Sequence, residues 1–155
     1  MEYKIINNMN DNIAKEICSW KYNNEFQIYN MPKFETAKIK NYSICNPNKS
    51  KEFFCFFNDQ NILVGYCRFI FKDNYFEMGI GLSPTWIGGG RGGEIINLSI
   101  NELKKNNPSA KIKLQVRSWN IRAIKCYQKC GFKIISTKTV LDKSNTPCEF
   151  VFMEL

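Results

Sequence analysis

Apolar residues follow two patterns along the chain, and each predicts a different kind of element. Near the N-terminus, Ile13, Ile17 and Trp20 recur at the spacing that places them on one face of a helix. Asn10 or Asp11 is suited to cap that helix. In the middle of the chain, aromatic and β-branched residues instead run together in stretches separated by short polar turns, which predicts an antiparallel meander.

The order of these patterns predicts the fold class. We expect helices over 10–22, 92–105 and 120–130, a shorter helix with irregular flanks within 26–42, and strands over 3–6, 53–57, 62–71, 75–82, 111–116, 132–139 and 149–155. A meander followed by alternating strands and helices indicates an α/β (α+β) fold: a mixed, mostly antiparallel sheet of about six to seven strands flanked by about four helices. The length of 155 residues is typical of one domain, spanning 1–155.

The cysteine content bounds the compartment and the metal chemistry. The chain has 7 cysteines, an odd number whose spacing forms no disulfide framework, and its polar N-terminus lacks an apolar signal segment. We therefore expect reduced thiols, no membrane span and a cytoplasmic protein. Cys126 and Cys130 stand four apart on a predicted helix, and the chain has no histidine, so no metal site is expected.

The formal net charge of +8 raises the question of nucleic acid as a partner. The basic clusters, 104–105 and 111–113, are short and interrupted, and no recognition helix or aromatic RNA-binding strand is present. A basic surface suits a polyanionic cofactor equally well. Nucleic-acid binding is therefore the weaker of these two interpretations.

A glycine-rich segment lies between a predicted strand and a predicted helix. It consists of Gly88, Gly89, Gly90, Arg91, Gly92 and Gly93. Glycines let a ligand approach the backbone closely, and the first N–H groups of a helix point at it together with the positive end of the helix dipole. The segment is a candidate binding site for a pyrophosphate, and Arg91 is a candidate to meet a phosphate or simply to face solvent.

Other phosphate-binding motifs fit this segment less well. Gly88, Gly90 and Gly93 satisfy G-x-G-x-x-G, but a dinucleotide fold places that turn after its first strand, with an acidic residue about 20 positions on. Here the turn follows a meander, and the next strand, KIKLQV, carries no acid. No Lys-Ser or Lys-Thr follows the glycines, so the P-loop pattern fails, and a plain turn without a ligand remains the other alternative.

A second motif decides among these interpretations. The block from Asn120 through Ala123 and Tyr127 to Gly131 and Phe132 closely resembles N-x-x-A-x-x-x-Y-x-x-x-G-F of the GNAT N-acetyltransferases. The glycine segment stands at the spacing found in that family. The resemblance extends to ribosomal-protein-alanine and small-molecule amine acetyltransferases. It implies the GNAT fold and an enzyme that transfers an acetyl group from acetyl-CoA directly to a primary amine.

The resemblance also implies a set of cofactor contacts. The main chain of Ile80, Gly81 and Leu82 should meet the pantetheine arm, and the amides of the glycine segment should bind the pyrophosphate. Ile87 stands where the family often has Gln or Arg, so one side-chain contact is missing. Asn120 is suited to cap its helix and, in the family, also helps to place the cofactor.

Two residues carry the catalytic roles that the resemblance implies. Tyr127 matches the general acid that protonates the departing thiolate, the alternative being a core tyrosine. Glu77 matches a general base on the strand before the glycine segment, the alternatives being a solvent-facing strand residue or a base reached through water. Gln115 stands where some relatives carry a glutamate, and an amide cannot accept a proton.

The N-terminal part is expected to choose the acceptor. A less specific likeness, W-x-Y…Y-N-M, is carried by Trp20, Tyr22, Tyr29, Asn30 and Met31. The candidates to line an acceptor pocket are Tyr22, Phe26 and Tyr29, whereas Trp20 is expected in the core. The acceptor, a small molecule or a protein N-terminus, stays open, as does the oligomeric state, a homodimer included. The alternative function is a non-catalytic module that binds or senses acetyl-CoA.

Overall fold

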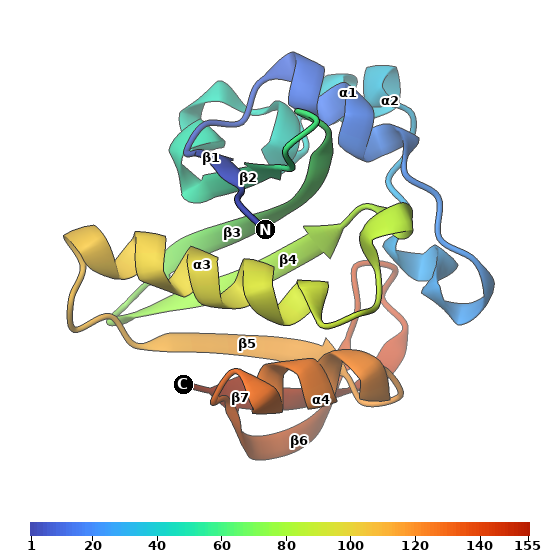
Figure 1. The fold of residues 1–155 in the computed structure, drawn as a ribbon. Helices are drawn as coiled ribbons and strands as arrows, with labels where there is room; N and C mark the ends of the chain where they lie inside the picture. The colour runs from blue at the N-terminus through green and yellow to red at the C-terminus, as the bar shows by residue number, and fades with distance from the viewer. The chain divides into compact units, whose positions relative to one another are not determined.

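The computed structural model describes residues 1–155 as a sheet with helices (Figure 1). The strands are β1 (Lys4–Ile6), β2 (Phe53–Phe57), β3 (Leu63–Lys72), β4 (Tyr75–Leu82), β5 (Ile112–Arg117), β6 (Lys133–Leu141) and β7 (Pro147–Glu154). The α-helices are α1 (Asp11–Ser19), α2 (Phe34–Ile39), α3 (Arg91–Asn106) and α4 (Ile121–Lys129). Short 3₁₀ helices cover η1 (Asn24–Tyr29), η2 (Ser43–Cys45), η3 (Pro47–Glu52) and η4 (Pro84–Trp86).

The seven strands form one mixed sheet in the order β1-β2-β3-β4-β5-β7-β6. The pairs β1–β2, β2–β3, β5–β7 and β6–β7 are antiparallel, whereas β4 and β5 run parallel. The parallel pair follows from the chain, because α3 connects the two strands as a crossover. The predicted fold class is therefore confirmed.

Two compact units make up the chain, and each has its own buried interior. The first comprises 1–68 with 80–89, and the second comprises 69–79 with 90–155. In the first, the apolar face of α1 packs against residues of β2 and β3. The fully buried side chains of this core include Phe53, Cys55 and Leu63. The expectation of one domain over 1–155 stays a prediction.

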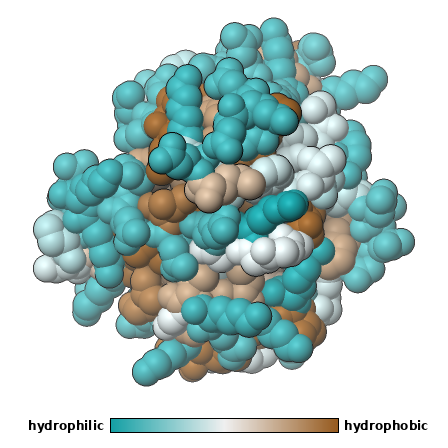
Figure 2. Space-filling model, in the orientation of Figure 1, coloured by the Kyte–Doolittle hydropathy of each residue, from teal (hydrophilic) through white to brown (hydrophobic).

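The second unit buries one face of α3 and alternate residues of two strands. Its buried residues include Ile95, Ile96, Ile100 and Leu103 of α3, Ile112, Leu114 and Val116 of β5, and Val151 and Met153 of β7. Hydrophilic side chains cover much of the face drawn in Figure 2, with smaller apolar patches between them. None of the helices combines the length and the apolar character that a membrane-spanning helix needs.

The N-terminal helices are shorter than the sequence predicts. Asn10 caps α1 as expected, but the helix ends at Ser19 because Trp20 turns to an extended ψ of 130°. The shorter helix with irregular flanks expected within 26–42 is α2, and η1 precedes it. Pro32 lies between η1 and α2, and a residue that precedes proline is disfavoured in the α conformation.

Candidate active site

The glycine segment begins α3 with backbone that other residues rarely adopt. Gly88, Gly89 and Gly90 have φ of 99°, 62° and 78°. Gly90 is the N-cap of α3 and, lacking a side chain, makes no capping hydrogen bond to the first turn. The first N–H groups of a helix have no partner within the helix. This helix start therefore presents main-chain donors and the positive end of the helix dipole to a ligand.

The space around these glycines is open. A Cβ built at Gly88 or Gly90 would meet no atom within 4 Å, so packing does not explain the absence of a side chain there. At Gly93 a Cβ would lie 3.7 Å from the sulfur of Cys130, an ordinary contact. The positive φ values and the open space fit a backbone that a pyrophosphate approaches closely. Arg91, the first residue of α3, is half-buried.

The end of β4 is held from within the first unit. The N–H of Ser83 donates to the carbonyl of Val64 at 2.9 Å. The hydroxyl of Tyr22 donates to the carbonyl of Leu82 at 2.5 Å. Gly81 lies directly against the ring of Tyr66, since a Cβ there would overlap a ring carbon. Only glycine fits that position on β4.

Tyr66 is a site neighbour that the sequence pattern did not indicate. Its ring stacks on Trp20 at a centroid distance of 6.2 Å and also packs against Phe53. Burial raises the pKa of its hydroxyl to about 12, so the phenol stays protonated at neutral pH. The one sequence feature that bears on it is the glycine at 81, because an aromatic residue often covers a glycine on a neighbouring strand.

The three candidate acceptor residues lie in and before η1. Tyr22 and Phe26 are half-buried, whereas Tyr29 is 40% exposed. The side chain of Asn30 accepts the N–H of Tyr22 at 2.7 Å and lies 3.5 Å from its carbonyl, so the main chain at Tyr22 is held in place. Trp20 is buried in the core, as expected. The binding roles of Tyr22, Phe26 and Tyr29 stay predictions.

Helix α4 carries the two polar residues of the second motif. Asn120 is buried and caps the helix, its side-chain oxygen accepting the N–H of Ala123 at 3.2 Å. Tyr127 is also buried and packs edge-to-face on Phe132, at a centroid distance of 5.8 Å. The N–H of Phe132 donates to the carbonyl of Tyr127, which ties the glycine turn after α4 to the helix. The capping role of Asn120 is confirmed, and the acid role of Tyr127 stays a prediction.

The candidate base lies on β4 in the second unit. Glu77 pairs with Lys72 of β3 at 2.8 Å, and its side chain is 32% exposed. It stands opposite Lys113 where β4 and β5 run parallel. An ion pair this exposed contributes little to stability, about 0–1 kcal/mol. Glu77 is thus a carboxylate with solvent access and a cationic partner, and its role as base stays a prediction.

The thiols near the glycine segment are in their neutral form. Burial raises the pKa of both Cys126 and Cys130, and the two thiols share a hydrogen bond. A thiol is a far weaker nucleophile than a thiolate, so neither side chain is prepared for attack on a thioester. None of the seven cysteines forms a disulfide, and no three metal-ligating side chains come together.

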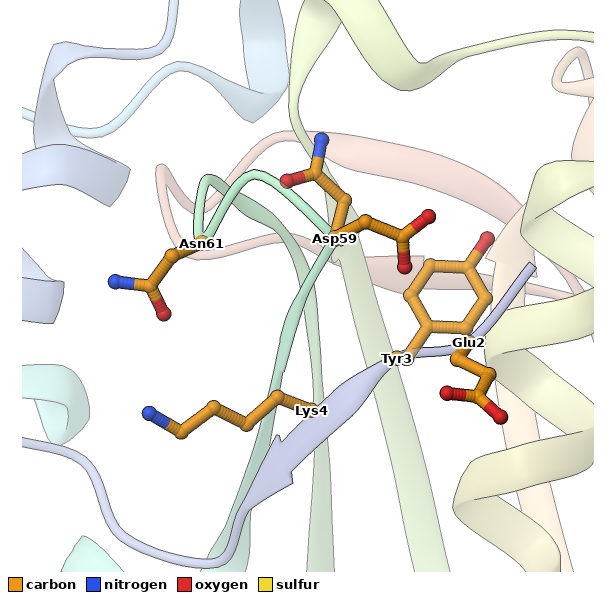
Figure 3. Close-up of a pocket in the computed structure, with 6 residues that line it drawn as sticks. Glu2, Tyr3, Lys4, Asp59 and Asn61 are labelled. Carbon is orange, nitrogen blue, oxygen red and sulfur yellow. The ribbon is translucent and has the colours of Figure 1, made fainter.

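A separate pocket lies in the first unit and contains none of the candidate cofactor, catalytic or acceptor residues. It has a volume of about 350 Å³ and is lined by Glu2, Tyr3, Lys4, Asn58, Asp59 and Asn61. Figure 3 shows the carboxylates of Glu2 and Asp59 beside the ring of Tyr3, with Lys4 and Asn61 extending away from it. The lining is mostly polar and contains no motif residue, so we assign this pocket no part in the reaction.

A match to a known family accounts for both motifs. Residues 14–132 match the acetyltransferase (GNAT) family, which covers the glycine segment and all of α4. The chain belongs to the GNAT acetyltransferase family. The members of this GNAT family are N-acetyltransferases that typically use acetyl-CoA.

Solved structures show the same fold. A GNAT-family acetyltransferase from Bacillus anthracis matches with a TM-score of 0.80 and 14% identity, over 100% of this chain and 95% of that one. Spermidine N-acetyltransferase from Vibrio cholerae, in complex with CoA and spermine, matches with a TM-score of 0.78 and 17% identity. The match covers 99% of this chain and 94% of that one. The ribosomal-protein-S18-alanine N-acetyltransferase from Escherichia coli matches with a TM-score of 0.68 and 16% identity. The match covers 99% of this chain and 93% of that one. No curated protein sequence matches the chain.

Proposed function

We propose that this GNAT protein transfers an acetyl group from acetyl-CoA to a primary amine of a small molecule or a protein N-terminus. The observation that carries the proposal is the start of α3. Three consecutive glycines with positive φ, no side-chain cap and open space at Gly88 and Gly90 make a backbone site for a pyrophosphate. A capping side chain in place of glycine would add only about a few tenths of a kcal/mol, so leaving this helix start open for a ligand costs the fold little.

Several residues of this chain would hold the cofactor. The amides from Gly88 to Gly93 would bind the pyrophosphate, and Arg91 would add a positive charge nearby. The main-chain groups of Ile80 and Leu82, on either side of Gly81, would meet the pantetheine arm. Because Ile87 offers no side-chain donor, binding depends on the main chain. When bound, acetyl-CoA supplies the acetyl group as an activated thioester.

Two side chains of the protein would accept and donate the protons of the reaction. An alkyl ammonium with a pKa near 10 is only about one part in a thousand neutral at pH 7, so the acceptor must lose a proton before it attacks. Glu77, directly or through water, would take that proton. As the nitrogen forms its bond to the carbonyl carbon, the bond to sulfur breaks. The hydroxyl of Tyr127 would then donate its proton to the departing thiolate.

Direct transfer fits the cysteines better than a covalent intermediate does. Burial raises the pKa of Cys126 and Cys130, so both are protonated thiols at neutral pH. The pKa of Cys55 rises to about 12 for the same reason. The acetyl group would therefore pass to the amine nitrogen in one step, without resting on the protein.

The neighbours offer two acceptor classes to test. One is named a spermidine N-acetyltransferase and another acts on an alanine of ribosomal protein S18. Polyamines and peptides with a free N-terminal alanine are therefore the first acceptors to try. Aminoglycosides and amino acids follow, since one fold serves many acceptors.

The experiment is an acceptor screen that follows release of free CoA thiol. Purified protein and acetyl-CoA are combined with each amine class, with N-acetylated forms of the same amines as matched controls. The proposal expects thiol release that depends on at least one free amine and is absent with its acetylated form. Tight CoA binding with no amine-dependent release would favour the alternative, a module that binds acetyl-CoA without catalysis.

A further inference from the structure

The backbone groups of β4 divide between its two edges. Along a strand, the N–H and C=O groups of successive residues point alternately to one edge and the other. Ser83 donates to Val64 of β3, whereas Phe76 donates to Lys111, which precedes β5. The groups of Gly81 therefore face β3, and those of Ile80 and Leu82 face the opposite edge of β4. Only the latter two residues can offer main-chain groups to a ligand along that edge.

The peptide unit between Leu82 and Ser83 is fixed at both of its polar groups. Its carbonyl accepts the hydroxyl of Tyr22 at 2.5 Å, and its N–H donates to Val64 at 2.9 Å. The carbonyl can only accept, so the proton of the hydroxyl points at Leu82. Rotation of this peptide unit would break both hydrogen bonds. The end of β4 therefore has one orientation for as long as Tyr22 is in place.

Tyr22 is itself held in place. The side chain of Asn30 accepts the N–H of Tyr22 and donates to its carbonyl. Lys21 donates to the carbonyls of Cys18 and Met31, at 3.3 and 3.2 Å, and so joins the two ends of the loop that contains η1. The hydroxyl thus extends from a closed loop to the strand end, across 60 positions of sequence.

We infer that Tyr22 is a positioning residue for the cofactor strand: its hydroxyl orients the end of β4, along which the pantetheine arm binds. This inference rests on the proposed function and gives Tyr22 a different task from contact with the acceptor. It also connects the loop expected to choose the acceptor with the strand expected to hold the cofactor. A change in the loop would then alter cofactor binding without touching the cofactor.

The test compares Tyr22→Phe with Tyr42→Phe. Both changes remove only a hydroxyl from a half-buried ring of the first unit, and Tyr42 lies outside the proposed site. A lost hydrogen bond that leaves a carbonyl without its partner corresponds to a change of about five- to 150-fold. We expect Tyr22→Phe to raise the Kd for CoA and the KM for acetyl-CoA by that factor. The acceptor KM of the Tyr22→Phe protein should stay within twofold of the wild-type value. For the Tyr42→Phe protein, the Kd for CoA and the KM for acetyl-CoA should also stay within twofold of the wild-type values.

Asn30→Ala provides an independent route to the same contact. It should also raise the Kd for CoA. In the double variant with Tyr22→Phe, the change in binding free energy for CoA should be smaller than the sum of the two single changes, since both act on one hydrogen bond. Melting temperatures of all variants separate misfolding from positioning. A folded Tyr22→Phe protein with wild-type CoA affinity would overturn the inference, as would a rise in acceptor KM alone. Wild-type protein that binds no CoA would instead remove the proposed function itself.

Discussion

Replacement of Gly90 by alanine tests the glycine segment with the smallest possible change. Gly90 has φ of 78° and caps α3, and a Cβ there would meet no atom within 4 Å. The substitution therefore introduces no clash in the protein, and its effect on stability comes from the left-handed backbone alone, about 1–2 kcal/mol. For a chain of this length that corresponds to a melting temperature lower by about 2–8 °C.

The effect on ligand binding should be larger than the effect on folding. The added methyl group fills space that the proposed pyrophosphate needs, and each hydrogen bond from an amide to a charged group contributes about 1.5–3 kcal/mol. Loss of one such bond raises the Kd for CoA about 10- to 150-fold. Titration calorimetry with CoA measures this directly.

Gly79→Ala is the matched control for this experiment. A Cβ at Gly79 also meets nothing within 4 Å, but Gly79 does not have a positive φ and lies outside the glycine segment. Its CoA affinity should equal that of the wild type. If Gly90→Ala shows the expected drop in melting temperature while its CoA affinity stays within twofold of the wild type, the segment does not bind the pyrophosphate.

Three further predictions concern the chemistry. Tyr127→Phe keeps the ring against Phe132 and removes the acid, so the turnover rate should fall at least about tenfold with CoA affinity nearly unchanged; wild-type turnover would exclude Tyr127 as the acid. Cys126→Ala and Cys130→Ala should each keep most of the activity, and a protein-bound acetyl-cysteine that forms and decays at the catalytic rate in mass spectra would contradict direct transfer. Glu77→Gln should lower the turnover rate with CoA affinity nearly unchanged if Glu77 is the base; wild-type turnover would leave the ion pair with Lys72 as its only role, worth about 0–1 kcal/mol.

Elements with strong local patterns could be predicted from the sequence. The bounds of β2 and β4 agree with the prediction, because polar turns separate continuous apolar strands. The cap at Asn120 could also be predicted, since a short polar side chain before a helix bonds locally. The glycine segment could be predicted as well, because a run of glycines before a helix by itself indicates a backbone conformation that other residues rarely adopt.

Contacts that depend on tertiary pairing could not be predicted. The bond from Tyr22 to Leu82 joins segments that meet only once β4 is in place. The ring of Tyr66 covers Gly81 because of the register between neighbouring strands, which the sequence pattern does not specify. The bounds of α2 within 26–42 could not be predicted either, because the sequence indicates only a shorter helix with irregular flanks there.

The central claim is that the protein moves an acetyl group from acetyl-CoA to an amine nitrogen. The most direct measurement uses acetyl-CoA labelled in the acetyl group and follows the label by mass spectrometry in the amine, in the protein and in water-soluble acetate. We predict one labelled acetyl group on a primary amine for each CoA thiol released, and none retained by the protein. Label that appears as free acetate, or stays on acetyl-CoA with every amine tested while CoA binds tightly, would contradict it.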